Sequence, residues 1–130
     1  MKYSSDARSA AFRPKPHPEW VARLNEEGGH MDIGGIVPLD ENSLLSTARA
    51  NTGLDDFGED SWHEPFQVLI KAFNEESKLT LMGRLMCRSE ILGFLEARLN
   101  IEETYKQHPE IEDEEIVQPL LVTGQGRTGT

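Results

Sequence analysis

The sequence has a single cysteine and no long apolar run, and each shortage argues against a class of protein. A single cysteine among 130 residues cannot form a disulfide within the chain, and no CxxC or Cys/His cluster accompanies it as a structural zinc site requires. No apolar run approaches the roughly 18–20 residues that cross a bilayer, so we expect no transmembrane helix. The first residues lack the apolar segment of a signal peptide. We therefore expect a soluble protein in a reducing, cytoplasmic setting.

Basic residues are also scarce. The chain has 13 Lys and Arg but 23 Asp and Glu, which gives it a net charge of −10. This balance argues against nucleic-acid binding through a broad basic face. The charge is uneven: the first 24 residues carry five basic and two acidic side chains, a net of +3, and the remainder carries −13. Pro14, Pro16 and Pro18 disfavour helix before them, so residues 1–17 are predicted to form a disordered basic leader.

Residues 18–115 are predicted to form a helical region, because hydrophobic residues recur there at intervals of three and four. Cap residues mark several ends: Asp40 and Thr80 suit the N-cap, and Gly53 suits the left-handed position after a last turn. Gly83 and Gly93 weaken the longest helix by roughly 1 kcal/mol each, and close packing of another helix against them would explain their presence. The predicted helices run from Pro18 to Gly28, over about 41–52, onward from Pro65, from Thr80 to about Leu99, and from Ile101 to His108.

The chemistry is expected at the end of the chain, in residues 116–130. The run 119–123 is predicted to be a buried parallel-type strand that leads directly into a glycine-rich loop. Glycines allow successive N–H groups to point at an anion, and Arg127 can add a charge-assisted pair to phosphate or sulfate. Spacing alone leaves two interpretations equally open, a phosphate cradle or an ordinary strand-to-loop turn with a surface arginine.

The loop is not the nucleotide-triphosphate motif GxxxxGK[ST]. Gly124 and Gly129 have the right separation, but Thr130 stands where the lysine belongs, and the basic residue precedes the second glycine. ATP hydrolysis by the usual route is therefore disfavoured. Asp56-Phe57-Gly58 spells the magnesium-binding tripeptide of protein kinases, but the other kinase motifs are missing, so Phe57 is better interpreted as a core residue.

The segment Leu120-Leu121-Val122-Thr123-Gly124-Gln125-Gly126-Arg127-Thr128-Gly129-Thr130 resembles the 5′-phosphosulfate-binding loop of sulfotransferases, G-x-x-R-[ST]-G-T-T. Upstream residues also resemble the helical N-terminal region of the bacterial branch of that family, so the resemblance covers about 38–130. One departure is Gly126, where many relatives have proline. The upstream residues that agree are Leu45, Ala48, Thr52-Gly53-Leu54, Asp56-Phe57-Gly58, Glu64-Pro65, Leu79-Thr80, Gly83-Arg84, His108-Pro109-Glu110-Ile111 and Pro119.

The resemblance implies transfer of a sulfuryl group from 3′-phosphoadenosine 5′-phosphosulfate to a hydroxyl or amine of a small-molecule acceptor, without a metal. It implies a P-loop-like α/β fold that this mostly α-helical chain would only begin. Arg127 would be the catalytic residue, stabilising charge on the transferring group. The base and the 3′-phosphate site of the family come later than residue 130, so we expect an inactive N-terminal fragment. The donor-binding residues would be Gly124, Gln125, Gly126, Arg127, Thr128, Gly129 and Thr130.

Two other functions stay open at this point. One is a helical protein-interaction module for which the glycine-rich end is a mere tail. The other is a P-loop-like small-molecule kinase with an atypical loop, against which the missing lysine argues. For the sulfotransferase, Trp20, Trp62, Phe66 and Phe73 are candidates to line an apolar acceptor channel, and core packing is the favoured role of Phe66 and Phe73. A buried thiol is the favoured interpretation of Cys87.

Overall fold

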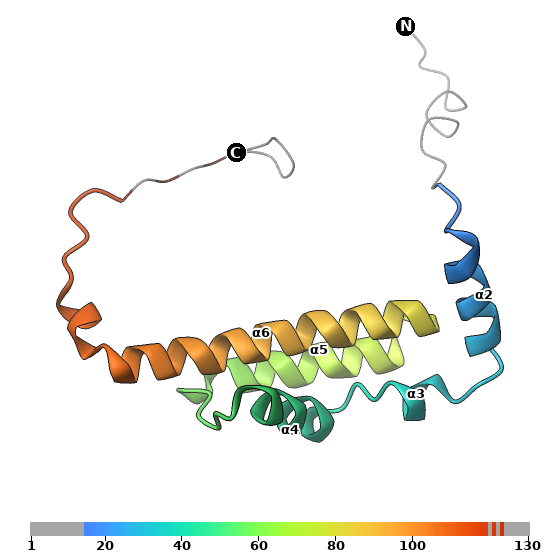
Figure 1. Cartoon of the computed structure of the whole chain (residues 1–130), viewed down its shortest axis with the longest axis horizontal. Coiled ribbons are helices and arrows are strands. Elements are labelled where there is room, and N and C mark those ends of the chain that lie inside the picture. The colour runs from blue at the N-terminus through green and yellow to red at the C-terminus, as the bar shows by residue number, and fades with distance from the viewer. Residues whose placement is uncertain (1–14, 120, 122, 124–130) are drawn as a thin grey trace, which may run out of the picture.

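The computed structural model describes residues 15–119, 121 and 123, and every regular element among them is helical. Figure 1 shows the long helix α6 as the backbone of the arrangement, with α5 and α4 running along it and α2 standing at its N-terminal end. The mostly α-helical composition predicted from the sequence is thereby confirmed. The elements are α2 Glu19–Gly28, α3 Ile33–Ile36, α4 Glu41–Thr52, α5 His63–Glu75 and α6 Leu81–Gln107, with 3-10 turns η1 Asp60–Trp62 and η2 Pro109–Asp113.

The predicted caps set the helix limits. The Asp40 carboxylate accepts a hydrogen bond from the Ser43 N–H (2.9 Å), and the Thr80 hydroxyl accepts one from the Gly83 N–H (3.2 Å). Gly53 has a φ of 72°, the left-handed conformation that favours glycine after a last helical turn. Local sequence signals therefore fix both ends of α4 and the start of α6.

Two predicted limits need correction. The helices expected to end near Leu99 and to start at Ile101 are one continuous helix, because no proline or glycine interrupts them and Leu99 is anchored in the core. Helix α5 begins at His63 rather than at Pro65. Pro65 lies in its first turn, where the missing N–H has no helical partner to lose.

The core lies between α4, α5 and α6. Leu39, Leu44 and Leu99 are the largest side chains that are almost completely buried. Phe57 is 6% exposed, so its predicted role as a core residue is confirmed. The buried residues of this core are Leu39, Leu44, Ala48, Phe57, Phe66, Ile70, Ile91, Leu95 and Leu99, with Cys87 partly buried against them.

The helix packing expected over Gly83 and Gly93 is not found among the described residues. A Cβ at Gly93 would meet nothing within 4 Å, and one at Gly83 would meet only Leu79 and Thr80 of its own N-terminal turn. Met86, on the same helix, is 63% exposed. The reason is that α4 and α5 both lie on the opposite side of α6, toward Ile91 and Leu95.

A different glycine allows the close helix contact. Gly28 ends α2 against the start of α6, where an added Cβ would come within 2.6 Å of the Leu81 Cβ. The Asn25 side chain accepts a hydrogen bond from the Met82 N–H at the same junction (3.0 Å). The short helix predicted after Pro18 therefore docks on the N-terminus of α6.

The structure describes only part of the strand that the sequence predicts over residues 119–123. Of the predicted strand, Pro119, Leu121 and Thr123 are described; they have no strand structure, and Leu121 is 80% exposed. No second strand exists among the described residues to pair with this segment, and an unpaired strand leaves its backbone hydrogen bonds unmade. Leu120, Val122 and residues 124–130 lie outside the described part, as do residues 1–14 of the predicted leader.

Candidate functional site

The predicted phosphosulfate loop, from Gly124 to Thr130, lies outside the residues that the structure describes. The described part instead offers hollows in the helical body. No helix in this part is long and apolar enough to cross a membrane. The same residues contain no group of three His, Cys, Asp or Glu side chains placed to hold a metal ion.

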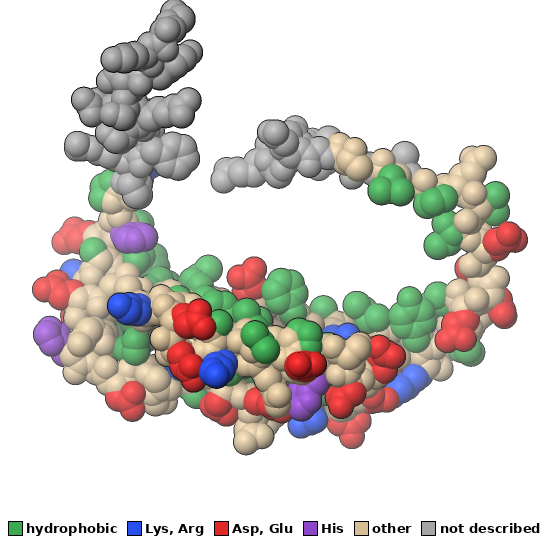
Figure 2. Space-filling model, turned by 180° about the vertical axis from the view of Figure 1, so that it is seen from behind, with side chains coloured by type: hydrophobic (Ala, Val, Ile, Leu, Met, Phe, Trp, Pro, Cys, Tyr) green, Lys and Arg blue, Asp and Glu red, His purple; other side chains and the backbone are tan. Residues whose placement is uncertain are grey.

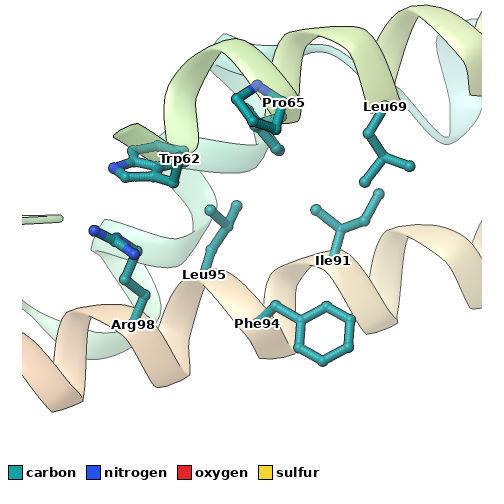
Figure 3. Close-up of a pocket in the computed structure, with 8 residues that line it drawn as sticks. Trp62, Pro65, Leu69, Ile91, Phe94, Leu95 and Arg98 are labelled. Carbon is teal, nitrogen blue, oxygen red and sulfur yellow. The ribbon is translucent and has the colours of Figure 1, made fainter. Parts of the chain in front are cut away.

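One apolar hollow is a groove of about 350 Å³ between α5 and α6 (Figure 3). Pro65 and Leu69 line it from α5, and Ile91 points toward them from α6. Phe94 lines its edge, with its ring turned away from α5. Trp62 and Arg98 close one end of the groove. A groove with apolar walls and one cation at its end suits an apolar molecule or side chain.

An aromatic cluster forms the closed end of the groove. The Trp62 ring lies 5.3 Å from the Phe57 ring and 5.6 Å from the Phe66 ring, centroid to centroid. The Arg98 guanidinium lies 5.5 Å from the centre of the Trp62 ring, a cation–π distance. The indole N–H of Trp62 is buried and has no hydrogen-bond partner among the described residues. The cluster fixes Trp62 through ring contacts rather than hydrogen bonds.

Trp62 also borders a second, polar hollow of about 350 Å³, which lies between the start of α4, the loop after it and η1. Its walls carry three carboxylates and one arginine, Arg49, whose guanidinium lies 5.2 Å from the centre of the Phe57 ring. The lining residues are Glu41, Leu45, Arg49, Asp55, Phe57, Gly58, Asp60, Trp62 and His63.

The shortest polar contact in this hollow joins His63 and Glu41. His63 Nε2 lies 2.6 Å from Glu41 Oε1, and the Gln67 side chain donates to Glu41 Oε2 (3.0 Å). The hydrogen bonds from His63 and Gln67 lower the pKa of Glu41, and the bond to Glu41 raises the pKa of His63. Such a pair can move a proton, but here it also joins the first residues of α4 and α5. No Ser, Thr, Cys or Lys side chain lines the described part of the hollow.

The tripeptide Asp56-Phe57-Gly58 has a structural role. Asp56 accepts a hydrogen bond from the Gly58 N–H (2.8 Å) and pairs with Lys106 (2.6 Å), and these contacts lower the pKa of Asp56. The Arg98 guanidinium donates to the Phe57 carbonyl oxygen (2.5 Å). The loop is thus tied to α6 at two points, with Phe57 inserted into the core.

Of the four aromatic residues considered for an acceptor channel, the structure brings together Trp62 and Phe66. Trp20 is 63% exposed on α2, away from the groove, and Phe73 packs against the core without lining it. Sequence reasoning missed Arg98 and the pair of His63 with Glu41. No local signal marks them, because their partners are 22 to 41 residues away in the chain.

Comparisons with family models, with curated proteins and with solved structures find no match to this chain.

Proposed function

We propose that this chain supplies the donor-binding loop and the helical N-terminal region of a sulfotransferase. The observation that carries the proposal is the loop from Gly124 to Thr130, which resembles the 5′-phosphosulfate loop of that family and follows a predicted strand. A loop of glycines and hydroxyl side chains around one arginine is chemically suited to a dianionic phosphosulfate.

Some of the upstream residues that share the resemblance have clear packing roles. Gly53 ends α4, Phe57 fills the core and Thr80 caps α6. The Arg84 guanidinium donates to the Val37 carbonyl oxygen. These packing roles support the proposal that this chain and the sulfotransferase family have a helical unit in common. The proposal that they have the same chemistry rests on the loop alone.

In the proposed reaction, an acceptor oxygen or nitrogen attacks the sulfur of 3′-phosphoadenosine 5′-phosphosulfate. The bond between sulfur and the bridging phosphate oxygen breaks, its electron pair stays with the 5′-phosphate, and the acceptor proton goes to a base. Arg127 would stabilise the charge that develops on the sulfuryl and phosphate oxygens. Thr128 and Thr130 would donate hydroxyl hydrogen bonds to the same group. The base would come from a segment outside the 130 residues.

The apolar groove between α5 and α6 is the best candidate for the acceptor in this proposal. It is lined by Trp62 and Phe66, which the sequence already suggested for an acceptor channel. Its apolar walls favour an acceptor with an aromatic or aliphatic body and a single hydroxyl or amine.

Donor binding is tested by titrating the ¹⁵N-labelled chain with 3′-phosphoadenosine 5′-phosphosulfate and following amide chemical shifts. We expect saturable shifts at residues 124–130, with little response to ATP at the same concentration. Arg127→Ala should weaken binding by about 10²-fold, since a charge-assisted contact is lost, and Arg127→Lys should retain part of it. Arg23→Ala, at an exposed arginine of α2, is the matched control and should bind normally.

Equal shifts with ATP would favour the kinase alternative. If neither nucleotide moves the loop amides, or if Arg127→Ala binds as well as the unaltered chain, this loop is not a donor site and the sulfotransferase proposal fails.

The interaction module is a second candidate, favoured by one observation. Helix α6 exposes large hydrophobic side chains, among them Phe94 at 68% and Ile101 at 54%. Exposed apolar surface of this kind marks contact with another surface.

A further inference from the structure

One face of α6 is left uncovered by the rest of the described chain. Phe94, Ile101 and Tyr105 are 68%, 54% and 49% exposed there. Figure 2 shows hydrophobic side chains gathered along one long edge of the helical body. The open space over Gly93, one residue from Phe94, agrees with an uncovered helix surface at this point.

The residues on this face have a symmetric spacing. The residues four, seven and eleven positions before and after Phe94 lie on the same face of the helix, because these intervals are close to whole numbers of helical turns. The residues at equal distances are complementary in kind: an acid and an arginine, two apolar residues, and a glycine and a tyrosine. In chain order they are Gly83, Cys87, Glu90, Phe94, Arg98, Ile101 and Tyr105.

We propose that two copies of this chain pair through this face of α6, antiparallel, with Phe94 at the two-fold axis. Such a two-fold places each residue of the row opposite the residue at the same distance on the other side of Phe94. Glu90 of one copy then faces Arg98 of the other, and Cys87 faces Ile101. The small surface at Gly83 accommodates the ring of Tyr105.

Charge complementarity selects a second copy as the occupant. Glu90 forms no ion pair within the described part of the chain. Arg98 uses its Nε and one terminal nitrogen on loop carbonyls, and that same nitrogen lies 3.7 Å from a carboxylate oxygen of Glu102 in its own helix. Its other terminal nitrogen has no hydrogen bond within the described part. The antiparallel pairing brings Glu90 of each copy to this nitrogen of the other copy. Each copy has a net charge of −10, but at about 0.15 M salt the Debye length is only about 8 Å, which limits the repulsion.

The size of the surface sets the expected strength. From Gly83 to Tyr105 the helix is about 33 Å long, at about 1.5 Å per residue. Exposed Pro65 and Leu69 of α5 border the same face at the groove and widen the contact. This remains below the roughly 20–30 residues per side of a standard interface, so we expect a dissociation constant in the micromolar range. The pairing does not depend on the sulfotransferase proposal, and because Phe94 and Arg98 also line the groove proposed for the acceptor, pairing and acceptor binding would exclude one another.

Sedimentation equilibrium of the full chain between about 5 μM and 1 mM tests the pairing. We expect a reversible monomer–dimer equilibrium. Phe94→Glu should raise the dissociation constant more than about tenfold, because a central aromatic residue carries much of such an interface. Trp20→Glu, at an equally exposed aromatic residue on α2, should leave it unchanged. Far-UV circular dichroism of both variants should match that of the unaltered chain.

Cross-linking tests the orientation. In the antiparallel pair the two Cys87 residues are about 21 Å apart along the helix axis, too far for a disulfide, whereas Ile101→Cys puts a thiol opposite Cys87 of the other copy. Under mild oxidation we expect covalent dimers of Ile101→Cys and none of the unaltered chain. The matched control Trp20→Cys should stay uncross-linked.

Three results would overturn the proposal: a monomer at all concentrations, dimerisation that Phe94→Glu does not weaken, or cross-linking of unaltered chains through Cys87, which indicates a parallel pair. If the chain is monomeric at 1 mM, we infer that another segment of the chain or a different protein covers this face.

Discussion

Three arginines of α6 satisfy backbone carbonyl groups in the loops that join the helices. Arg84 and Arg88 donate to the carbonyl oxygens of Val37 and Pro38, before α4. Arg98 donates to those of Phe57 and Glu59, after α4 (2.5 and 3.1 Å). Loop carbonyls near a core need partners, and a guanidinium can serve two of them from a helix that is already fixed. The charge of these arginines is thus used to hold loops.

His63 and Glu41 make the fold sensitive to pH. The pKa of Glu41 is lowered from 4.5, so its contribution to stability is present above about pH 4.5 and is lost as the pH falls through the lowered pKa. The pKa of His63 is raised from 6.5, so its contribution is present below about pH 6.5 and is lost as the pH rises through the raised pKa. Between about pH 4.5 and 6.5, the contributions of Glu41 and His63 to the free energy of unfolding are both fully present.

We therefore expect Glu41→Gln to reduce the free energy of unfolding most between about pH 4.5 and 6.5, and less at about pH 9. Urea unfolding followed by circular dichroism across this range measures the difference. His30→Gln, at an exposed histidine, is the control and should show no such window. A destabilisation by Glu41→Gln that is constant with pH would contradict the ionic contribution of the pair.

At the scale of elements, α6 organises the molecule. Its 27 residues contact α2 at one end, α4 and α5 along the middle and η2 at the other end. Its length comes from the absence of proline between Leu81 and Gln107 together with the burial of Leu95 and Leu99, which outweighs the weakening by Gly83 and Gly93. Because α4 and α5 both pack on the side of this helix that carries Ile91, Leu95 and Leu99, another side of it stays uncovered.

Two glycines of the helical elements should respond oppositely to alanine. Gly53→Ala places a Cβ on a residue with a φ of 72°, and we expect a loss of about 1 kcal/mol in the free energy of unfolding. Gly93→Ala adds a methyl group in open space within α6, and we expect a gain of about 0.5–1 kcal/mol.

Thermal and urea unfolding of the two variants measure these changes, with Gly53→Asn as a control that should recover part of the loss because asparagine tolerates the left-handed region. Destabilisation by Gly93→Ala would mean that a tightly packed neighbour, from this chain or another copy, occupies the space over that residue.

At the scale of the whole molecule, the described residues that follow the helical body contribute little to its core. Every described residue from Glu112 onward is exposed, including Ile116 at 79% and Val117 at 77%. Burial of apolar surface supplies most of the stability of a fold, and these residues bury little. The body from Glu19 to Ile111 is therefore expected to fold without them.

Deleting residues 112–130 should leave the midpoint of urea unfolding and the helical circular dichroism nearly unchanged. If the sulfotransferase proposal holds, the same deletion should abolish all response to 3′-phosphoadenosine 5′-phosphosulfate. Deleting residues 1–14 is the matched control and should keep that response. A large loss of stability on C-terminal deletion would show that the loop segment packs on the helical body.

The sequence by itself determined the helical class, the caps at Asp40, Gly53 and Thr80, and the core position of Phe57, because caps and apolar spacing act within a few residues. Only the tertiary structure decided which face of α6 is buried, that Gly28 rather than Gly83 or Gly93 allows a close helix contact, and that His63 meets Glu41. These contacts join residues far apart in the chain, and local periodicity does not specify the partner. The loop from Gly124 to Thr130 remains a prediction from the sequence alone.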